Sequence, residues 1–520
     1  MIFSDPSFLF LVLPLTLLLF YAAVPRLGKT AGMGIVFVAS LIIYWPWGER
    51  NVTILLASVL VNYTAAITLL SLPPERQGLR KTVLALGLGY DLLSLAWFKY
   101  TIFQYFYYRT VGVQATLEAA AIPIGISFYT FQQAAVLADA FNYEPSVRSF
   151  LGQLERSTHK LRAFVRYAFF VTFFPHMIIG PIAYVHEIWP QLASKRFGRF
   201  RQIDIAVGIM LIGIGLFKKL VIADNLADFS APVFAGAAQG GSLNVVSAGL
   251  GILAYYTQLY FDFSGYSDMA LGLARLFGIV FPINFYSPLK SVGIVDFYRR
   301  WHMTLTRVIS RFLFSPISLF GTRYSMERRL GPIPSKLLRL WLPLVINFEV
   351  IGLWHGALWT FALFGAIHGL WYVVEMEVRS SKKWKAWKKK TSAGLRRALG
   401  RLIFVGPMAL TFALFRSESV AAFFHLVREL FRFDLHVPQS IPPLAAAQWI
   451  AAALIIIYAL PNSVELLSRY NPGIMTYENE SYGFRLKWRP NWRWAAYWTM
   501  LVLISLHYIW RQPPFLYMGF

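Results

Sequence analysis

Two histidines in apolar surroundings are the residues of this sequence best suited to chemistry. His355 lies between Trp354 and Gly356 in the stretch GLWHGALWTFALFGAIHGLW, and His302 ends the stretch FYRRWH. An imidazole ring kept neutral in a dry pocket accepts a proton from a hydroxyl group or briefly carries an acyl group. We therefore predict that His355 acts as a general base or as an acyl relay. Glycines on both sides of it are expected to let a substrate chain or a backbone approach closely.

A second histidine in the same stretch, His368, is not expected to share a site with His355. The two are 13 residues apart, which on a helix separates them by about 20 Å and turns them about 220° apart. His368 is therefore predicted to be structural. His302, 53 positions upstream of His355, is the other histidine of the candidate pair.

Carboxylates and tyrosines gather in the stretch YTQLYFDFSGYSDMALGL, which carries Asp262, Tyr266 and Asp268. An ionisable residue at membrane depth is costly, so it is a functional candidate. On one helix the two carboxylates would point about 240° apart, unless a break at Gly265 brings them together, and the turn-forming residues of FSGYSD favour such a break. The role that we favour is architectural, with the carboxylates tying backbone groups and tyrosine hydroxyls together at a membrane–water boundary.

The elements that must position these residues are membrane helices. Of 520 residues, 57% are hydrophobic and 14% are charged, whereas soluble domains carry about 25% charged residues. Apolar windows cover residues 8–24, 33–47, 52–72, 83–97, 119–141, 164–184, 205–222, 245–260, 269–285, 338–354, 358–378, 402–415, 445–460 and 494–508. We predict an all-α polytopic membrane protein with a single domain over residues 1–520. About 10 to 13 of its helices should span the bilayer, and others should be re-entrant or interfacial.

The net charge of +24 is distributed so that it predicts the orientation of these helices. Lys and Arg cluster in alternate loops, and such clusters remain in the cytoplasm, which places the N-terminus outside it. Both flanks of residues 164–184 are basic, so this segment, which contains Pro175 and Gly180, is expected to dip into the membrane and return. The run KKWKAWKKK is assigned to lipid headgroups, with no nucleic-acid partner.

Several kinds of chemistry lack the residues that they need. The chain has no cysteine, which excludes disulfides, thiolate metal sites and a cysteine acyl-enzyme. It contains no GxxxxGK[ST], GxGxxG or HExxH motif, so ATP hydrolysis, dinucleotide binding and zinc peptidase activity have no support. No metal and no bound cofactor are predicted.

Taken together and in this order, YFDFSGYSDMALGL, RRWH and GLWHGA resemble the membrane-bound O-acyltransferase family. The likeness is strongest to its bacterial branch, which includes the alginate O-acetylation membrane protein and the membrane protein of teichoic acid D-alanylation. It extends to IPIGISFYTFQ, to FFPHMIIGP, to the Lys218-Lys219 pair and to PFLYMGF near the C-terminus.

The resemblance implies a helical bundle with a central tunnel and an acetyltransferase activity. His355 would be the essential histidine and His302 the second active-site residue, inside that tunnel. The acyl donor, acetyl-CoA or another acyl thioester, would be a substrate on the cytoplasmic side of the bacterial inner membrane. The acetyl group would reach an extracytoplasmic polysaccharide through an SGNH-type partner, beside the polysaccharide synthesis machinery. Candidate substrate- or donor-binding residues are Arg299, Arg300, Trp354, Asp262, Tyr266 and Asp268.

The sequence departs from the bacterial pattern FWRRWHISLSxWLRDYLY in the helix that follows RRWH. Here the stretch is FYRRWHMTLTRVISRFLF, with Tyr298 in place of Trp and with Ser310-Arg311 in place of Arg-Asp. We therefore expect a protein outside the alginate group proper. The alternative function is a transporter or channel in which the same polar residues line a path without chemistry. Paired interrupted helices, the mark of inverted repeats in transporters, are not visible in the sequence.

Overall fold

The computed structural model describes residues 1–100, 122–152, 157–433, 440–475, 483–511 and 515–516. The first helices are α1 (Leu13–Leu27), α2 (Lys29–Tyr44), α3 (Glu49–Ser71), α4 (Gln77–Lys99), α6 (Ile126–Phe141), α7 (Pro145–Leu151), α8 (Ser157–Thr172), α9 (Phe174–Met177), α10 (Val185–Ala193), α11 (Gln202–Leu216), α12 (Asp224–Ala238) and α13 (Val245–Leu276). The others are α14 (Ile294–Tyr298), α15 (Met303–Ile309), α16 (Ser315–Glu327), α17 (Pro332–Lys336), α18 (Leu342–His355), α19 (Trp359–Ser380), α20 (Lys382–Lys390), α21 (Ala393–Arg416), α22 (Val420–Glu429), α23 (Pro443–Ala459), α24 (Ser463–Leu466) and α25 (Trp492–His507). No β-strand occurs in these ranges, which confirms the predicted all-α class.

Seven helical stretches of the described chain are long and apolar enough to cross a membrane. They are Phe8–Leu27, Lys29–Trp47, Glu49–Ser71, Gln202–Ala238, Pro332–His355, Trp359–Ser380 and Ala393–Arg416. Other predicted windows fold as shorter or more polar helices, among them α6, α13 and α25, while α23 is a shorter apolar helix. Residues 119–121 of one window lie outside the described residues. The protein is a multi-pass membrane protein.

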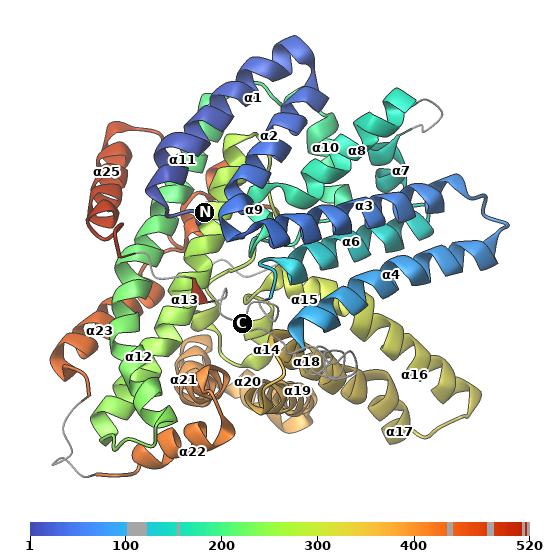
Figure 1. Ribbon diagram of the computed structural model, residues 1–520. Helices are drawn as coiled ribbons and strands as arrows, with labels where there is room; N and C mark the ends of the chain where they lie inside the picture. Colours follow the sequence, from blue (N-terminus) through green and yellow to red (C-terminus); the bar gives the residue numbers. More distant parts are fainter. Residues whose placement is uncertain (101–121, 153–156, 434–439, 476–482, 512–514, 517–520) are drawn as a thin grey trace, which may run out of the picture.

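Helix α13 runs through the centre of the bundle and packs on α11, α12, α21 and α23 (Figure 1). It continues unbroken through Gly265, so the predicted break there is wrong. The glycine instead lets two helices approach closely, because a Cβ atom at Gly265 would lie 2.9 Å from the carbonyl oxygen of Gly215 on α11. A Cβ at Gly272 would lie 2.6 Å from the carbonyl oxygen of Gly208. Small residues at such contacts are typical of membrane helix pairs.

The segment predicted to dip into the membrane does not form one helix. Helix α8 ends at Thr172, the short helix α9 follows, and residues 178–184 are buried without regular structure. Within this segment, the Nε2–H group of His176 donates to the Phe170 carbonyl oxygen over 2.7 Å, and its ring stacks on Phe281. His176 therefore holds the turn between α8 and α9.

Helices α18 and α19 form a tight antiparallel hairpin, with glycines along the contact. A Cβ atom at Gly352 would lie 2.3 Å from the Phe361 carbonyl oxygen, and one at Gly365 would lie 2.6 Å from that of Phe348. A Cβ at Gly356 would meet the Phe361 ring at 2.9 Å. The close approach of a backbone that was expected at the glycines beside His355 is thus confirmed, and α19, not a substrate chain, occupies that space.

Candidate active site

His302 and His355 line the same buried cavity, although 53 positions separate them in the sequence. The cavity has a volume of about 40 Å³, which is room for about three water molecules. An acetyl group, with three non-hydrogen atoms, is of the same size. The described wall is otherwise mostly apolar and aromatic, and it includes Leu259, Ile351, Phe364, Phe412 and Phe415.

His302 occupies the turn between α14 and α15 in a strained backbone conformation. Its φ angle is 44°, in the left-handed region that non-glycine residues rarely adopt. Such strain persists where neighbours hold it in place, often at functional sites. The neighbour here is Asn284, whose backbone carbonyl accepts from Met303 N–H and whose Oδ1 lies 3.1 Å from His302 Nδ1.

The same hydrogen bonds fix which nitrogen of His302 carries the proton. Asn284 Oδ1 also accepts from the Thr304 backbone N–H and from the Thr304 hydroxyl, so this atom is the amide oxygen. The Nδ1 atom of His302 must therefore be the donor, and Nε2 carries the lone pair. Nothing in the sequence pointed to Asn284, because it lies outside the motifs, in the loop after α13.

Burial lowers the pKa of His302 to about 3, which predicts acid sensitivity. The unfolded ring has a pKa near 6.5, so below that pH the unfolded chain binds a proton that the folded chain does not bind. Stability should therefore fall as the pH drops from about 6.5 toward 3, by about 1.4 kcal/mol per pH unit for this ring. We expect the His302→Asn protein to lose unfolding free energy less steeply between pH 6 and pH 4 in detergent. Parallel slopes for the two proteins would contradict this assignment.

His355 is the last residue of α18 and is 7% exposed. Its ring packs edge-on against Phe415, with 4.8 Å between centroids, and against Trp354 at the same centroid distance. The Trp354 ring is also 6.4 Å from that of His302. Trp354, predicted to bind substrate, therefore contacts both histidines.

Tyr298 lines this cavity and also contacts His368. The Tyr298 hydroxyl lies 2.6 Å from His368 Nδ1, both side chains are buried, and Tyr298 is part of the cavity wall. Helix α14, which carries Tyr298, is held at its start by Glu375 of α19, whose carboxylate accepts from the Ile294 N–H over 2.8 Å. Residues of α19 thus position the turn that ends in His302.

The two arginines of RRWH differ in their exposure to solvent. Arg299 is exposed, whereas Arg300 is buried. Arg300 donates from Nε to Asp296 over 2.8 Å, and its guanidinium lies over the Tyr286 ring. Neither arginine belongs to the described cavity wall. Arg300 secures the turn before His302, and Arg299 is the one open to solvent or to a ligand.

The carboxylates of α13 bind lysines. Asp262 pairs with Lys219 over 2.7 Å, and Asp268 pairs with Lys218 over 2.6 Å. Asp262 also accepts the backbone N–H of Leu516 over 3.0 Å. Because the helix is continuous, the two carboxylates serve separate ion pairs, and the structure does not bring them to the described cavity wall.

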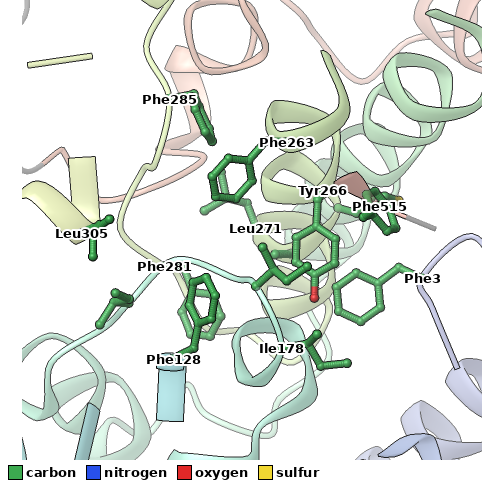
Figure 2. Packing of buried hydrophobic residues seen from close by; sticks show 14 of the residues in the cluster. Phe3, Phe128, Ile178, Phe263, Tyr266, Leu271, Phe281, Phe285, Leu305 and Phe515 are labelled. Atoms are coloured by element: carbon green, nitrogen blue, oxygen red, sulfur yellow. The ribbon is translucent and has the colours of Figure 1, made fainter. Parts of the chain in front are cut away.

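Tyr266 lies between the first and last parts of the chain. Its ring stacks on Phe3 with centroids 4.8 Å apart and meets Phe515 edge-on at 4.9 Å, as Figure 2 shows. Of the C-terminal motif PFLYMGF, Phe515 and Leu516 are described, and its other residues lie outside the described ones. These contacts show Tyr266 in a packing role, remote from the described cavity wall.

The departure at Ser310-Arg311 has a structural counterpart. Arg311 pairs with Asp139, a carboxylate on α6. In this chain the carboxylate partner of the arginine therefore comes from another helix. In the bacterial motif, by contrast, an arginine and a carboxylate are adjacent in sequence. Within the described ranges, no three His, Cys, Asp or Glu side chains gather so as to hold a metal ion.

A multi-pass helical membrane protein with two buried histidines at one small cavity is suited to moving a proton and a small group within the membrane. Comparison with known proteins gives this class a name. Residues 42–388 match the model of MBOAT, the membrane-bound O-acyltransferase family. The chain therefore belongs to the membrane-bound O-acyltransferase family, and it is an O-acyltransferase.

Three curated relatives illustrate the range of the family. The chain is 36% identical over 388 residues to the peptidoglycan O-acetyltransferase of Helicobacter pylori, a match covering 71% of this chain and 69% of that protein. It is 31% identical to the probable alginate O-acetylase AlgI of Azotobacter vinelandii, covering 88% and 85% of the two chains. It is 28% identical to the teichoic acid D-alanyltransferase of Streptococcus thermophilus, covering 56% and 68%.

Proposed function

We propose that the protein moves an acetyl group from cytoplasmic acetyl-CoA across the bacterial inner membrane for O-acetylation of an extracytoplasmic polysaccharide. The observation that carries this proposal is the placement of His302 and His355 at one buried cavity the size of an acetyl group. The relatives named as acetylating peptidoglycan and alginate support a polysaccharide acceptor.

The proposed reaction places His355 as the general base. His355 takes the proton of the acceptor hydroxyl while the oxygen attacks the thioester carbonyl carbon, forming a C–O bond and an oxyanion. The oxyanion then collapses, the C–S bond breaks, and the departing sulfur takes the proton back from His355. His302 positions the acceptor, because its Nε2 lone pair accepts a hydrogen bond from a hydroxyl of the acceptor while Asn284 holds its Nδ1 atom.

The donor is assigned to the side of the membrane that carries the basic loops. Helix α20 consists of KKWKAWKKK, with its six lysines exposed and with Trp384 packed on Trp387. Such a helix lies at the headgroups of the cytoplasmic leaflet. The same rule places the N-terminus outside the cytoplasm. On this side, the exposed Arg299 is the residue that we assign to the phosphates of the donor.

The acceptor is reached through a partner in this proposal. The partner is a periplasmic or membrane-anchored acetyltransferase of the SGNH type, next to the polysaccharide synthesis machinery. It receives the acetyl group at the extracytoplasmic mouth of the tunnel and places it on a polymer hydroxyl.

Inverted inner-membrane vesicles test the donor and the direction of transfer together. Acetyl-CoA labelled in the acetyl group and supplied outside such vesicles should label carbohydrate inside them when the full-length protein is present. Vesicles with His355→Ala should remain unlabelled. Label in wild-type vesicles only when acetyl-CoA is sealed inside would overturn the proposed direction, and no label in either case would overturn the proposed donor.

A further inference from the structure

A buried lysine, Lys99, contacts Trp354 beside the two histidines, and it has no oxygen partner among the described residues. It is the last residue of α4 and is 8% exposed. Its ammonium nitrogen lies 4.7 Å from the centroid of the Trp354 ring, the ring that contacts both histidines. The next residue, Tyr100, donates its hydroxyl to the Leu353 carbonyl oxygen over 2.9 Å. The end of α4 is thus fixed to the two residues that precede His355.

Other buried cations of the described ranges have oxygen partners, which for Arg80 and Lys290 include backbone carbonyls and for three others are carboxylates. Lys219 binds Asp262 and Asp224, Arg275 binds Asp204, and Arg300 binds Asp296. Among the described residues, no carboxylate, carbonyl or hydroxyl oxygen lies within hydrogen-bond distance of the Lys99 ammonium. An uncompensated charge in a dry interior is costly, so its presence calls for a role.

A structural role explains only part of this cost. A cation at a helix C-terminus gains from the helix dipole, which amounts to about half a charge there. Contact with the face of Trp354 adds a cation–π interaction. Neither one is an oxygen acceptor, and burial lowers the pKa of Lys99 to about 7, so a negative charge that develops beside this side chain would favour its charged form.

The proposed reaction generates that charge. When the hydroxyl oxygen attacks the thioester, the carbonyl π electrons move to oxygen, and on collapse the negative charge passes to the departing sulfur. A fixed positive charge near both atoms stabilises them most when water is excluded.

We infer that Lys99 is a further residue of the acyl-transfer site, whose ammonium stabilises the oxyanion and the departing thiolate beside His355. This inference rests on the proposed function. The Lys99 ammonium contacts the ring of Trp354, the residue next to His355, as expected of a group that serves the same reacting centre.

Three variants test the inference in the full-length protein in nanodiscs, with acetyl-CoA as donor, glycerol as acceptor and thiol release as the readout. Lys99→Met removes the charge but keeps the length of the side chain, and should lower kcat about 100-fold with KM changed less than about threefold. Lys99→Arg keeps the charge and should retain about a tenth of the activity or more. Lys81→Met, at an exposed lysine of the same helix, is the matched control and should behave like the wild type.

A melting temperature for Lys99→Met at or above that of the wild type is also expected, since a costly buried charge is removed. The inference is overturned if Lys99→Met keeps more than half of kcat, if Lys99→Arg is as inactive as Lys99→Met, or if only KM changes. Should the wild type release no thiol, the proposed donor is wrong. The same variants are then compared by the O-acyl content of the surface polysaccharide in cells, where Lys99→Met must again fall below Lys99→Arg.

Discussion

Replacing His355 with alanine is expected to lower the rate of acyl transfer about a thousandfold or more while the protein remains folded. The loss of a positioned general base costs about 10²- to 10⁴-fold in rate, and His355 would also exchange its proton with the departing group. The side chain is buried against Trp354 and Phe415. In cells that lack the native protein, the variant should leave the polysaccharide unacetylated at normal protein levels. Thiol release from acetyl-CoA measures the same loss in the purified protein.

The matched control for this variant is His507→Ala, at an exposed histidine that ends α25. It should retain the activity of the wild type. The same experiment separates the enzyme from a transporter, because secretion of the polymer should persist while its acetylation is lost. Acetylation that survived the removal of His355 would end the catalytic assignment.

Replacing Gly352 with alanine is expected to destabilise the protein by about 3 kcal/mol, the upper part of the range for overpacked sites. The added Cβ atom would lie 2.3 Å from the Phe361 carbonyl oxygen and 3.1 Å from the Gly365 Cα. Both are backbone atoms, so only a separation of α18 from α19 relieves the clash. Since His355 follows three residues later on α18, activity should fall together with stability. Thermal unfolding in detergent and the yield of monodisperse protein measure the effect.

Gly406→Ala is the matched control for Gly352→Ala. Gly406 lies within α21, and a Cβ atom there would meet nothing within 4 Å. Alanine is a better helix former than glycine by about 1 kcal/mol, so this variant should be slightly more stable than the wild type. Equal stability of the two variants would show that the hairpin of α18 and α19 is not tightly packed at Gly352.

The class of fold and the central pair of histidines could be predicted from the sequence, for different reasons. Apolar windows of about 20 residues report directly on membrane helices, and the named elements of the described ranges are all helices. The pairing of His302 with His355 followed from a helical argument that removed His368 and from the family motifs. The structure places both rings at one cavity.

Glycines were harder to interpret than histidines. Gly265 suggested a break in the helix, and Gly352 suggested the approach of a substrate chain or of a backbone. Each one allows two helices to touch. A glycine that lacks a side chain for packing reasons is indistinguishable in the sequence from one that turns the chain.

Asn284 and Lys99 lie near their partners only in the folded chain. Asn284 is 18 positions from His302, and Lys99 is more than 250 positions from the residues that it approaches. Neither belongs to a motif or repeats with a helical period, so only the fold shows what they contact. The roles of such residues depend on long-range packing that local sequence patterns do not encode.

The aromatic stack of Phe3, Tyr266 and Phe515 has a consequence for the order in which the molecule is completed. Membrane helices insert one after another during synthesis, so α13 enters the membrane long before residue 515 is made. Until then, Asp262 lacks the Leu516 N–H and Tyr266 lacks one of its two aromatic neighbours. Docking of residues 515–516 thus follows the synthesis of the other described elements. Chains truncated shortly before it should be cleared by membrane proteases faster than the full-length protein.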